Sequence, residues 1–293
     1  MDEAARRQAG HFDEHEPISP WPELMRNSGF RFNYIAKDLL IERSIEAATI
    51  SPGTRVLDIG CGSGVLLDRI GTTYGTTGTG IDISARSLSR AKSRAVTGSR
   101  FVVADARSLP FASHSYNLVI CLDVLEHIER SEVAVNEMLR IATADARVII
   151  YAISARNNYT LQWFERLLLS RIGIDLDFLA CHSRDLLVDP KSVSNVLHRN
   201  DQFTSDIQHF HGFFSSLFDR AWLLGYLVLK KIGLLSAKTP VYQYLGVVIL
   251  TAATIAARIA LDILLKLDGP WFVRGYSNGF LAVGRNSRTA ERF

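Results

Sequence analysis

Short apolar runs alternate with helical segments from Arg55 to Ala152, and this alternation limits the fold more than any other feature of the chain. Strands are predicted over 55–59, 78–83, 101–104, 117–122 and 147–152, with helices over 65–70, 85–95 and 132–142 between them. Apolar strands joined by helices are typical of a parallel sheet that is covered on both faces. Later strands over 203–209 and 279–283 extend the prediction to an α/β fold with a mostly parallel, seven-stranded sheet.

Further helices are expected over 22–48, 161–169 and 190–197. The chain of 293 residues then divides into four parts. These are an N-terminal segment and helical cap (1–50), a core domain (51–220), an apolar and basic helical insertion (221–270), and the last strand with a tail (271–293).

The most specific local motif is the run from Val56 to Gly64, VLDIGCGSG. A buried strand leads directly into three glycines and then into a helix. Glycine lets the backbone turn tightly and approach a ligand closely, because it has no Cβ. The helix N-terminus that follows attracts a carboxylate or a phosphate.

Two aspartates follow at the ends of the next strands. Asp82 lies 18 residues beyond Gly64 and could accept hydrogen bonds from ribose hydroxyls, while Asp105 could cap an adenine amino group. Val65 breaks the G-x-G-x-x-G order that dinucleotide-binding proteins prefer, and no Gly-Lys-Ser/Thr follows as in a P-loop. Adenosine without a pyrophosphate is therefore the favoured ligand.

Four ordered segments, VLDIGCGSG, GIDIS, VVADARSLPF and YNLVICLDVLEHI, resemble the motifs of class I S-adenosylmethionine-dependent methyltransferases of the type 11 group. The resemblance covers roughly residues 30–153 and implies a Rossmann-like fold and S-adenosyl-L-methionine as cofactor. It also implies roles for individual residues. The methionine end would be held by Asp58, Gly60, Cys61, Gly62 and Gly64, the ribose by Asp82 with Ile83 beside it, the adenine by Asp105 and Ala106, and the sulfonium would be flanked by Leu122 and Asp123.

His127 is the candidate general base, since an imidazole titrates near neutral pH and this one follows the fourth strand. It could instead only orient a helix start or contact the cofactor.

His209 and His211 are two residues apart on a predicted strand and could supply a base or a metal pair. A solvated edge strand explains them equally well, and no metal is expected. Cys61 is interpreted as a small space-filling residue.

Flanking segments resemble, more loosely, the ubiquinone-pathway polyprenyl O-methyltransferases. They are Asn33-Tyr34-Ile35, Ile153–Asn157 and Arg184–Pro190. This resemblance implies a small, lipophilic acceptor, with O-methylation favoured and C-methylation as the other option. Ala144-Asp145-Ala146 stands where that family has a proline-glycine-glycine turn. A dinucleotide-dependent oxidoreductase and a non-catalytic cofactor-binding module are the alternative functions.

Charge and hydropathy set the insertion apart. Residues 221–293 hold 9 Lys/Arg and 3 Asp/Glu, whereas residues 1–220 hold 24 and 27. A basic segment with an apolar stretch at Tyr244–Leu265 suits an anionic membrane surface better than nucleic acid, which is not an expected partner. We expect membrane contact through 222–267, with a lid or a homo-oligomer interface as alternatives.

The N-terminus lacks the apolar region of a signal peptide and the three cysteines show no disulfide pattern, so a cytoplasmic protein, peripheral on the inner face of the membrane, is expected.

Overall fold

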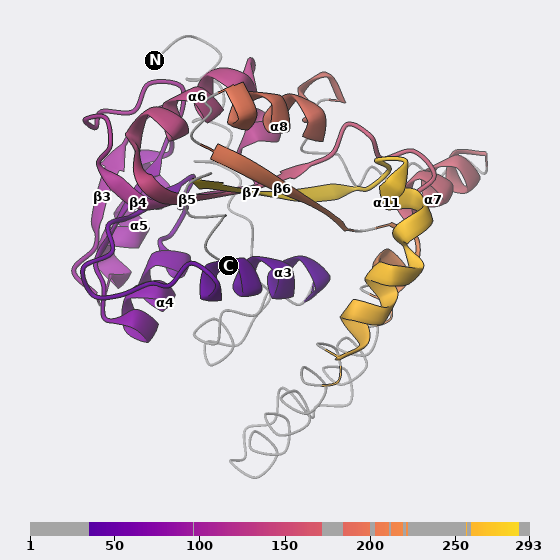
Figure 1. The fold of residues 1–293 in the computed structure, drawn as a ribbon, viewed down its shortest axis with the longest axis horizontal. Helices are drawn as coiled ribbons and strands as arrows, with labels where there is room; N and C mark the ends of the chain where they lie inside the picture. Colours follow the sequence, from indigo (N-terminus) through magenta and orange to yellow (C-terminus); the bar gives the residue numbers. More distant parts are fainter. Residues whose placement is uncertain are drawn as a thin grey trace.

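The computed structural model describes residues 35–95, 97–171, 184–199, 203–210, 212–218, 221, 256 and 259–286. They form one seven-stranded sheet with helices on both faces, which confirms the predicted α/β class (Figure 1). The strands are β1 (Val56–Ile59), β2 (Gly78–Asp82), β3 (Arg100–Val103), β4 (Tyr116–Leu122), β5 (Ala142–Ile153), β6 (Phe203–Phe210) and β7 (Gly279–Asn286). The helices are α3 (Ile35–Glu46), α4 (Val65–Tyr74), α5 (Ala85–Arg94), α6 (Ser131–Ile141), α7 (Leu161–Ser170), α8 (Pro190–Arg199) and α11 (Gly269–Val273), with short 3-10 turns η2 (Leu125–His127) and η3 (Arg184–Leu186).

The strand order is β3-β2-β1-β4-β5-β7-β6. Strands β1 to β5 pair in parallel, and β7 runs antiparallel to both β5 and β6. The last strand therefore returns to the same sheet as the first five, as expected. The chain order reverses between β1 and β4, and α/β proteins bind ligands in the crevice at the carboxyl ends of the strands at such a point.

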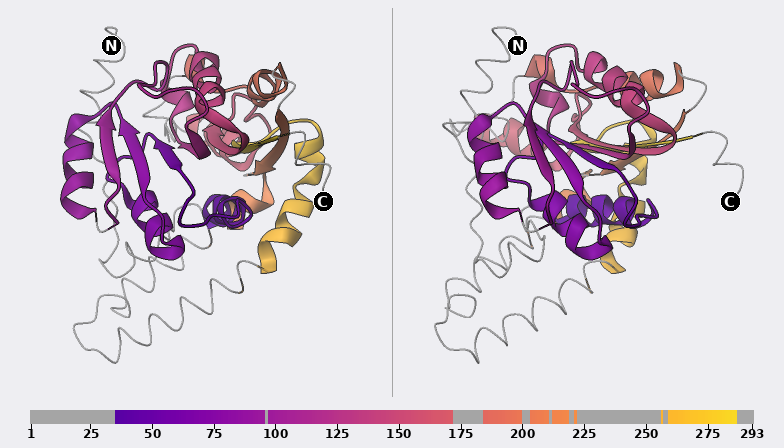
Figure 2. Two further views of the ribbon diagram at one scale, coloured as in Figure 1. Left: turned by 60° about the vertical axis from the view of Figure 1, so that its left-hand side comes forward. Right: turned by 90° about the vertical axis from the view of Figure 1, so that its left-hand side faces the viewer.

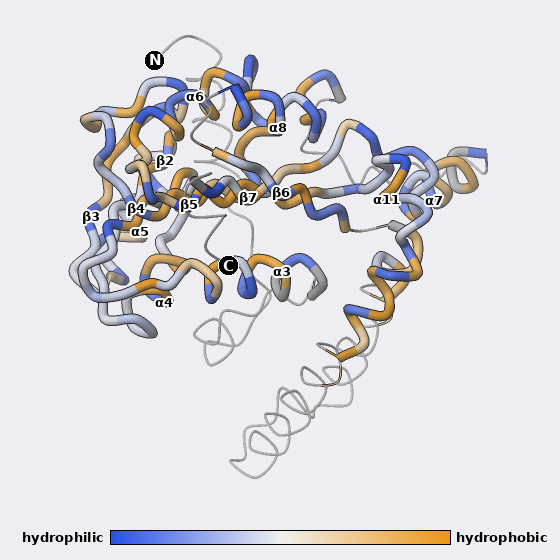
Figure 3. Tube along the Cα trace, viewed as in Figure 1, coloured by the Kyte–Doolittle hydropathy of each residue, from blue (hydrophilic) through white to orange (hydrophobic). Residues whose placement is uncertain are grey.

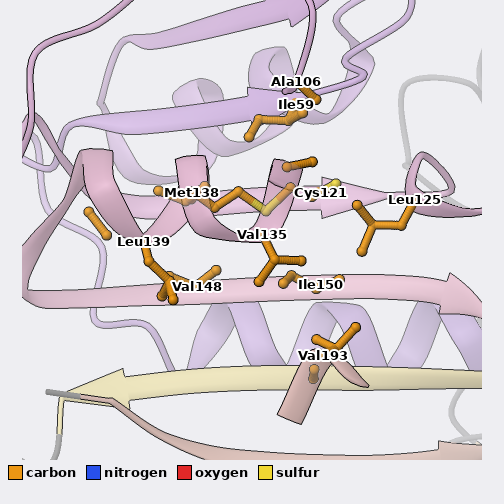
Figure 4. Close-up of a cluster of buried hydrophobic side chains, with 14 of the residues drawn as sticks. Ile59, Ala106, Cys121, Leu125, Val135, Met138, Leu139, Val148, Ile150 and Val193 are labelled. Carbon is orange, nitrogen blue, oxygen red and sulfur yellow. The ribbon is translucent and has the colours of Figure 1, made fainter. Parts of the chain in front are cut away.

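One face of the sheet is covered by α6 and α8 (Figure 4). Val135 and Met138 of α6 are fully buried, and Leu139 is nearly so. Their spacing of three and four residues places them on one side of the helix, which packs on β4 and β5. Burial of such side chains stabilises the domain by about 1.5–3 kcal/mol each.

The opposite face is covered by α3, α4 and α5 (Figure 2). Leu67 and Ile70 of α4 and Leu88 of α5 are each at most 2% exposed. These helices carry polar residues outward, whereas apolar residues are concentrated in the strands (Figure 3). This layer positions the turn between β1 and α4.

Two boundaries differ from the predictions by four residues or more. Helix α4 extends to Tyr74 and ends at Gly75, which has a left-handed φ of 66°. Strand β5 begins at Ala142, five residues before the predicted start at Arg147, and it includes residues 144–146. Ala142 pairs with Tyr116 across a register shift, so pairing with β4 overrides a local sequence that has no strand pattern.

Apart from Ala221, the apolar insertion is described only in its second half. Residues 222–255, on which most of the expected membrane segment falls, lie outside the described residues. Residues 259–267 are helical and project away from the sheet before α11, which continues the helical structure to Val273 (Figures 1 and 2). Leu261 is fully buried against the α3 layer, and Asp262 pairs with Arg43 of α3 at 2.6 Å. Among the described residues, we find no helix with the length and apolar character needed to cross a membrane.

Candidate functional site

The glycine turn after β1 adopts the backbone geometry that its sequence predicts. Gly60, Gly62 and Gly64 have φ values of 73°, 51° and 76°, which residues with a Cβ rarely adopt. The N–H groups of Gly60 and Cys61 both donate to the carbonyl of Ile81, at 2.8 and 2.9 Å. The turn is therefore fixed to β2 by backbone hydrogen bonds.

Asp82, at the end of β2, lies directly on this turn. Its Oδ2 accepts a hydrogen bond from the N–H of Gly62 at 2.9 Å, and its Oδ1 accepts one from the N–H of Ser84 at 2.8 Å. Ser84 in turn caps α5 by accepting a hydrogen bond from the N–H of Ser87. Asp82 and the glycine turn, which the sequence assigns to one cofactor, therefore lie in direct contact.

The two sides of the turn differ in the space beside them. A Cβ at Gly60 would overlap Cγ2 of Val124, at the start of η2, whereas no atom of the described residues lies within 4 Å of a Cβ built at Gly62. The turn thus packs closely against the end of β4 and is open at Gly62, beside a partly exposed carboxylate. This cradle fits a ribose-bearing ligand whose hydroxyls donate to Asp82.

Asp58 and Cys61 lie beneath the turn. Asp58 is 3% exposed and Cys61 is 9% exposed. Burial raises the pKa of the Cys61 thiol well above its usual range, and the negative charges of Asp58 and Asp82 raise it further. Cys61 Sγ would lie 2.7 Å from a Cβ at Gly80, so the neutral thiol fills space against β2.

The residues expected near the adenine follow β3. Asp105 is bound by Arg107, whose Nη2 lies 2.7 Å from Oδ2 and whose Nε lies 3.1 Å from Oδ1. Ala106 is buried in the core, and Ile83 is partly exposed after β2. The Ala104 N–H donates to the carbonyl of Asp82 at 3.1 Å, which keeps this segment beside the glycine-turn edge.

Leu122 is the last residue of β4, and Asp123, which follows it, contacts a residue that the sequence did not reveal. Asp123 has a left-handed φ of 57°, and its Oδ1 lies 2.6 Å from Nζ of Lys37 on α3. The Lys37 side chain is 8% exposed, and Nζ lies 4.0 Å from the centre of the Tyr151 ring. Local sequence gives no signal for this contact, because the two partners are 86 residues apart.

Glu126 and His127 lie in η2, which begins two residues after Asp123. His127 is partly exposed, and its backbone N–H donates to the carbonyl of Val124 at 3.0 Å. Glu126 is fully buried, and its Oε1 accepts a hydrogen bond from the N–H of Ile153 at 3.3 Å. The sequence indicates His127 as the candidate base and gives no sign that Glu126 beside it is buried.

His209 lies near the carboxyl end of β6, at the far side of the same edge. Its Nδ1 is 2.9 Å from Oγ of Ser277, and its ring stacks on Phe272. Burial lowers the pKa of His209, and the positive charge of Arg156 lowers it further. His211 lies outside the described residues. Within the described part of the chain, we find no group of three or more His, Cys, Asp or Glu side chains arranged to hold a metal.

Residues 57–150 match the family model described as "Methyltransferase domain". Three curated proteins are similar over 105 to 122 residues. They are the norajmaline N-methyltransferase of Rauvolfia serpentina (31% identical over 35% of this chain and 37% of the relative), the ubiquinone/menaquinone biosynthesis C-methyltransferase UbiE of Ectopseudomonas mendocina (32%, over 39% and 48%), and the 2-methyl-6-phytyl-1,4-hydroquinone methyltransferase of Synechocystis sp. (33%, over 35% and 33%). In each case the matched region spans less than half the length of the relative.

Solved structures share the fold at lower identity. The phosphoethanolamine N-methyltransferase 2 of Haemonchus contortus, in complex with S-adenosyl-L-methionine, superposes with a TM-score of 0.53 and 15% identity, over 94% of this chain and 56% of that one. The [4+2]-cyclase SpnF superposes with a TM-score of 0.50 and 18% identity, over 84% and 79%. These likenesses support the architecture alone.

Proposed function

We propose that this chain, which contains a class I S-adenosylmethionine-dependent methyltransferase domain, is an enzyme that transfers a methyl group from S-adenosyl-L-methionine to a small lipophilic acceptor. The observation that carries the proposal is the carboxylate of Asp82 on the glycine turn, 2.9 Å from the N–H of Gly62, beside the open side of that glycine. When bound, the cofactor supplies a methyl group on a positively charged sulfur. The protein then has to bind both partners, align them and exclude water.

The charges at the end of β4 suit the amino-acid end of this cofactor. Asp123 and Lys37 present opposite charges side by side, and a methionine group carries both an ammonium and a carboxylate. The glycine turn, which touches Val124 next to Asp123, joins this pair to the ribose-binding carboxylate of Asp82. These residues together would hold the cofactor along the carboxyl ends of β1, β2 and β4.

The acceptor would lie farther along the same edge, beyond β5. Partly exposed aromatic rings gather there from the segments that follow β5 and β6 and precede β7. Trp163 packs on Tyr159 at 5.1 Å between ring centroids, and Trp271 stacks on Phe213 at 6.2 Å. Such rings suit an apolar or aromatic acceptor. The names of two curated relatives refer to ubiquinone/menaquinone biosynthesis and to a phytyl hydroquinone, which supports a lipophilic substrate. The proposed acceptor atom is oxygen, with carbon, as in the name of the first of these relatives, as the other option.

We also propose that the insertion brings the site to a membrane surface, on the cytoplasmic side. Ile259, Ile263 and Leu267 recur every fourth residue on the projecting helix and are 67%, 59% and 48% exposed. On α7, which also lies on this side of the molecule, Leu167 and Leu168 are exposed as well. An apolar stripe of this kind on a basic segment is typical of helices that lie in the lipid interface.

Isothermal titration calorimetry tests the cofactor. The full chain should bind S-adenosyl-L-methionine and S-adenosylhomocysteine and should not bind NAD. Radiolabelled cofactor incubated with a cell lipid extract should then label an extractable lipid in the presence of the protein. Binding of NAD alone would support the oxidoreductase alternative. Cofactor binding without label transfer to any extract would support a non-catalytic module.

Co-sedimentation with vesicles tests the membrane contact. The full chain should sediment with vesicles that contain anionic lipid, and Ile263→Glu should reduce this binding. Val103→Glu is the matched control, because Val103 is 50% exposed on β3 at the opposite edge of the sheet. Equal sedimentation of the two variants would remove the projecting helix from the proposal.

A further inference from the structure

The carboxyl group of Glu126 is buried with one oxygen unused. Glu126 is fully buried, and only Oε1 accepts a hydrogen bond, from the N–H of Ile153. Among the described residues, Oε2 has no hydrogen-bond partner. Buried polar atoms without a partner are rare in folded proteins, so this oxygen needs a functional or structural reason.

Glu126 lies next to the parts that would hold the cofactor. It stands two residues after Val124, whose side chain contacts Gly60 of the glycine turn, and three residues after Asp123. Its hydrogen bond to Ile153 places it at the carboxyl end of β5, between the cofactor side and the aromatic side of the edge. A positive charge bound at the end of β4 would therefore lie close to this carboxyl.

Two nearby charges act on the ionisation of Glu126. Asp123, just after β4, disfavours it, and Lys37 on α3 favours it. Helix α6 and turn η3, which also contact η2, carry Glu132 and Asp185, and both of these are exposed. On β4, Cys121 is buried beneath, and its thiol stays neutral because burial and then Glu126 raise its pKa.

These surroundings keep the carboxyl protonated. Burial raises the pKa of Glu126 to about 8, and the negative charge of Asp123 adds to this increase. A protonated carboxyl cannot take a proton from an acceptor. An added positive charge nearby reverses the balance, because it stabilises the carboxylate form.

We propose that Glu126 is the proton acceptor of the site and that binding of the positively charged cofactor ionises it. The inference rests on the proposed function. In the transfer step, Oε2 of the carboxylate takes the proton of the acceptor's O–H or C–H group as that bond breaks. The electron pair left on the acceptor forms the bond to the methyl carbon, and the carbon–sulfur bond breaks with its electrons going to sulfur. After the transfer, the carboxyl group of Glu126 is protonated and lies beside an uncharged thioether. Burial of Glu126 favours this protonated form.

Proton release on ligand binding tests this coupling without any turnover. Titration calorimetry at pH 7.5 in two buffers of different ionisation enthalpy gives the number of protons released when S-adenosyl-L-methionine or S-adenosylhomocysteine binds. Both ligands have the same amino-acid end, so the difference between them reports the sulfonium charge. We expect the full chain to release roughly 0.5–0.8 more protons with the charged ligand.

Glu126→Gln should abolish this difference while still binding S-adenosyl-L-methionine, because the amide is a neutral isostere that can accept the Ile153 hydrogen bond. His127→Gln should leave the difference unchanged. A second measurement needs no variant. For the natural chain, the affinity for S-adenosyl-L-methionine should strengthen between pH 6 and 8, by up to about tenfold per pH unit, and by less for S-adenosylhomocysteine.

Tight binding of S-adenosyl-L-methionine with equal proton release for both ligands would overturn the role of Glu126 and leave the proposed function intact. Loss of the difference in His127→Gln, with retention in Glu126→Gln, would transfer the role to His127. Failure to bind S-adenosyl-L-methionine at all would overturn the proposed function and this inference with it.

Discussion

Three glycine-to-alanine substitutions can separate the contribution of the glycine turn to folding stability from its contribution to cofactor binding. Gly60, Gly62 and Gly98 have similar left-handed φ values of 73°, 51° and 72°. Alanine in this conformation costs about 1–2 kcal/mol. A Cβ at Gly60 would also overlap Val124, and overpacking of a stiff, β-branched side chain adds about 1–3 kcal/mol. In the part of the chain that the structure describes, no atom lies within 4 Å of a Cβ at either of the other two glycines.

The expected losses of unfolding free energy are therefore about 2–5 kcal/mol for Gly60→Ala and about 1–2 kcal/mol for Gly62→Ala and Gly98→Ala, measured by urea denaturation. Binding should give a different order. The new methyl group of Gly62→Ala would point into the open cradle, so the affinity for S-adenosyl-L-methionine should fall at least roughly tenfold, whereas Gly98→Ala, before β3, should bind normally. Equal affinities for these two variants would refute the assignment of the cradle to the cofactor.

Three further predictions concern charged residues. Asp268→Ala should lower the unfolding free energy by at least about 3 kcal/mol, since this buried carboxylate accepts hydrogen bonds from three backbone N–H groups between 213 and 215. Asp262→Ala, on the exposed pair with Arg43, should change it by less than about 0.5 kcal/mol. Similar losses in both variants would contradict the burial of Asp268. Lys37→Met should lower the unfolding free energy by about 1–3 kcal/mol, because Asp123 loses its partner in a pair that is only partly shielded from water. Lys37→Arg keeps the positive charge and should lower it less. An unchanged unfolding free energy of Lys37→Met would show that α3 does not dock there. Because the pKa of Glu126 is raised, the folded state holds a proton that the unfolded chain has lost between the ordinary pKa of 4.5 and about 8. The unfolding free energy should therefore fall by up to about 1.4 kcal/mol per pH unit over this range, and Glu126→Gln should remove that slope; identical pH profiles of stability for the two chains would disprove it.

The sequence predicted the sheet well where a strand is buried and punctuated by glycine. The run from Val56 to Ile59 is almost fully buried, and apolar residues bounded by Gly60 define it without further information. The first part of β5 could not be predicted, because Ala142 joins the sheet only through pairing with Tyr116. Turn η2 could not be predicted either, since its position depends on packing against the glycine turn.

The geometry of the candidate site was predictable where it depends on the pairing of neighbouring strands. It was not predictable where it depends on contacts between residues far apart in the sequence. The meeting of Asp82 with Gly62 follows from parallel pairing of β1 and β2, which brings their carboxyl ends together. The partner of Asp123 is contributed by α3, and no local pattern identifies Lys37 among the lysines of the chain. Nor does the sequence reveal that Glu126 is buried while His127 beside it is partly exposed.

The most direct test of the central claim is the affinity of Asp82→Ala for S-adenosyl-L-methionine, measured by titration calorimetry. Ser84→Ala is the matched control, because it removes the cap of α5 and leaves the carboxylate on the glycine turn. Loss of the ribose hydrogen bonds should weaken binding by the Asp82 variant roughly 5- to 150-fold, with little change for the Ser84 variant. Unchanged affinity of Asp82→Ala would contradict the assignment of this carboxylate to the cofactor.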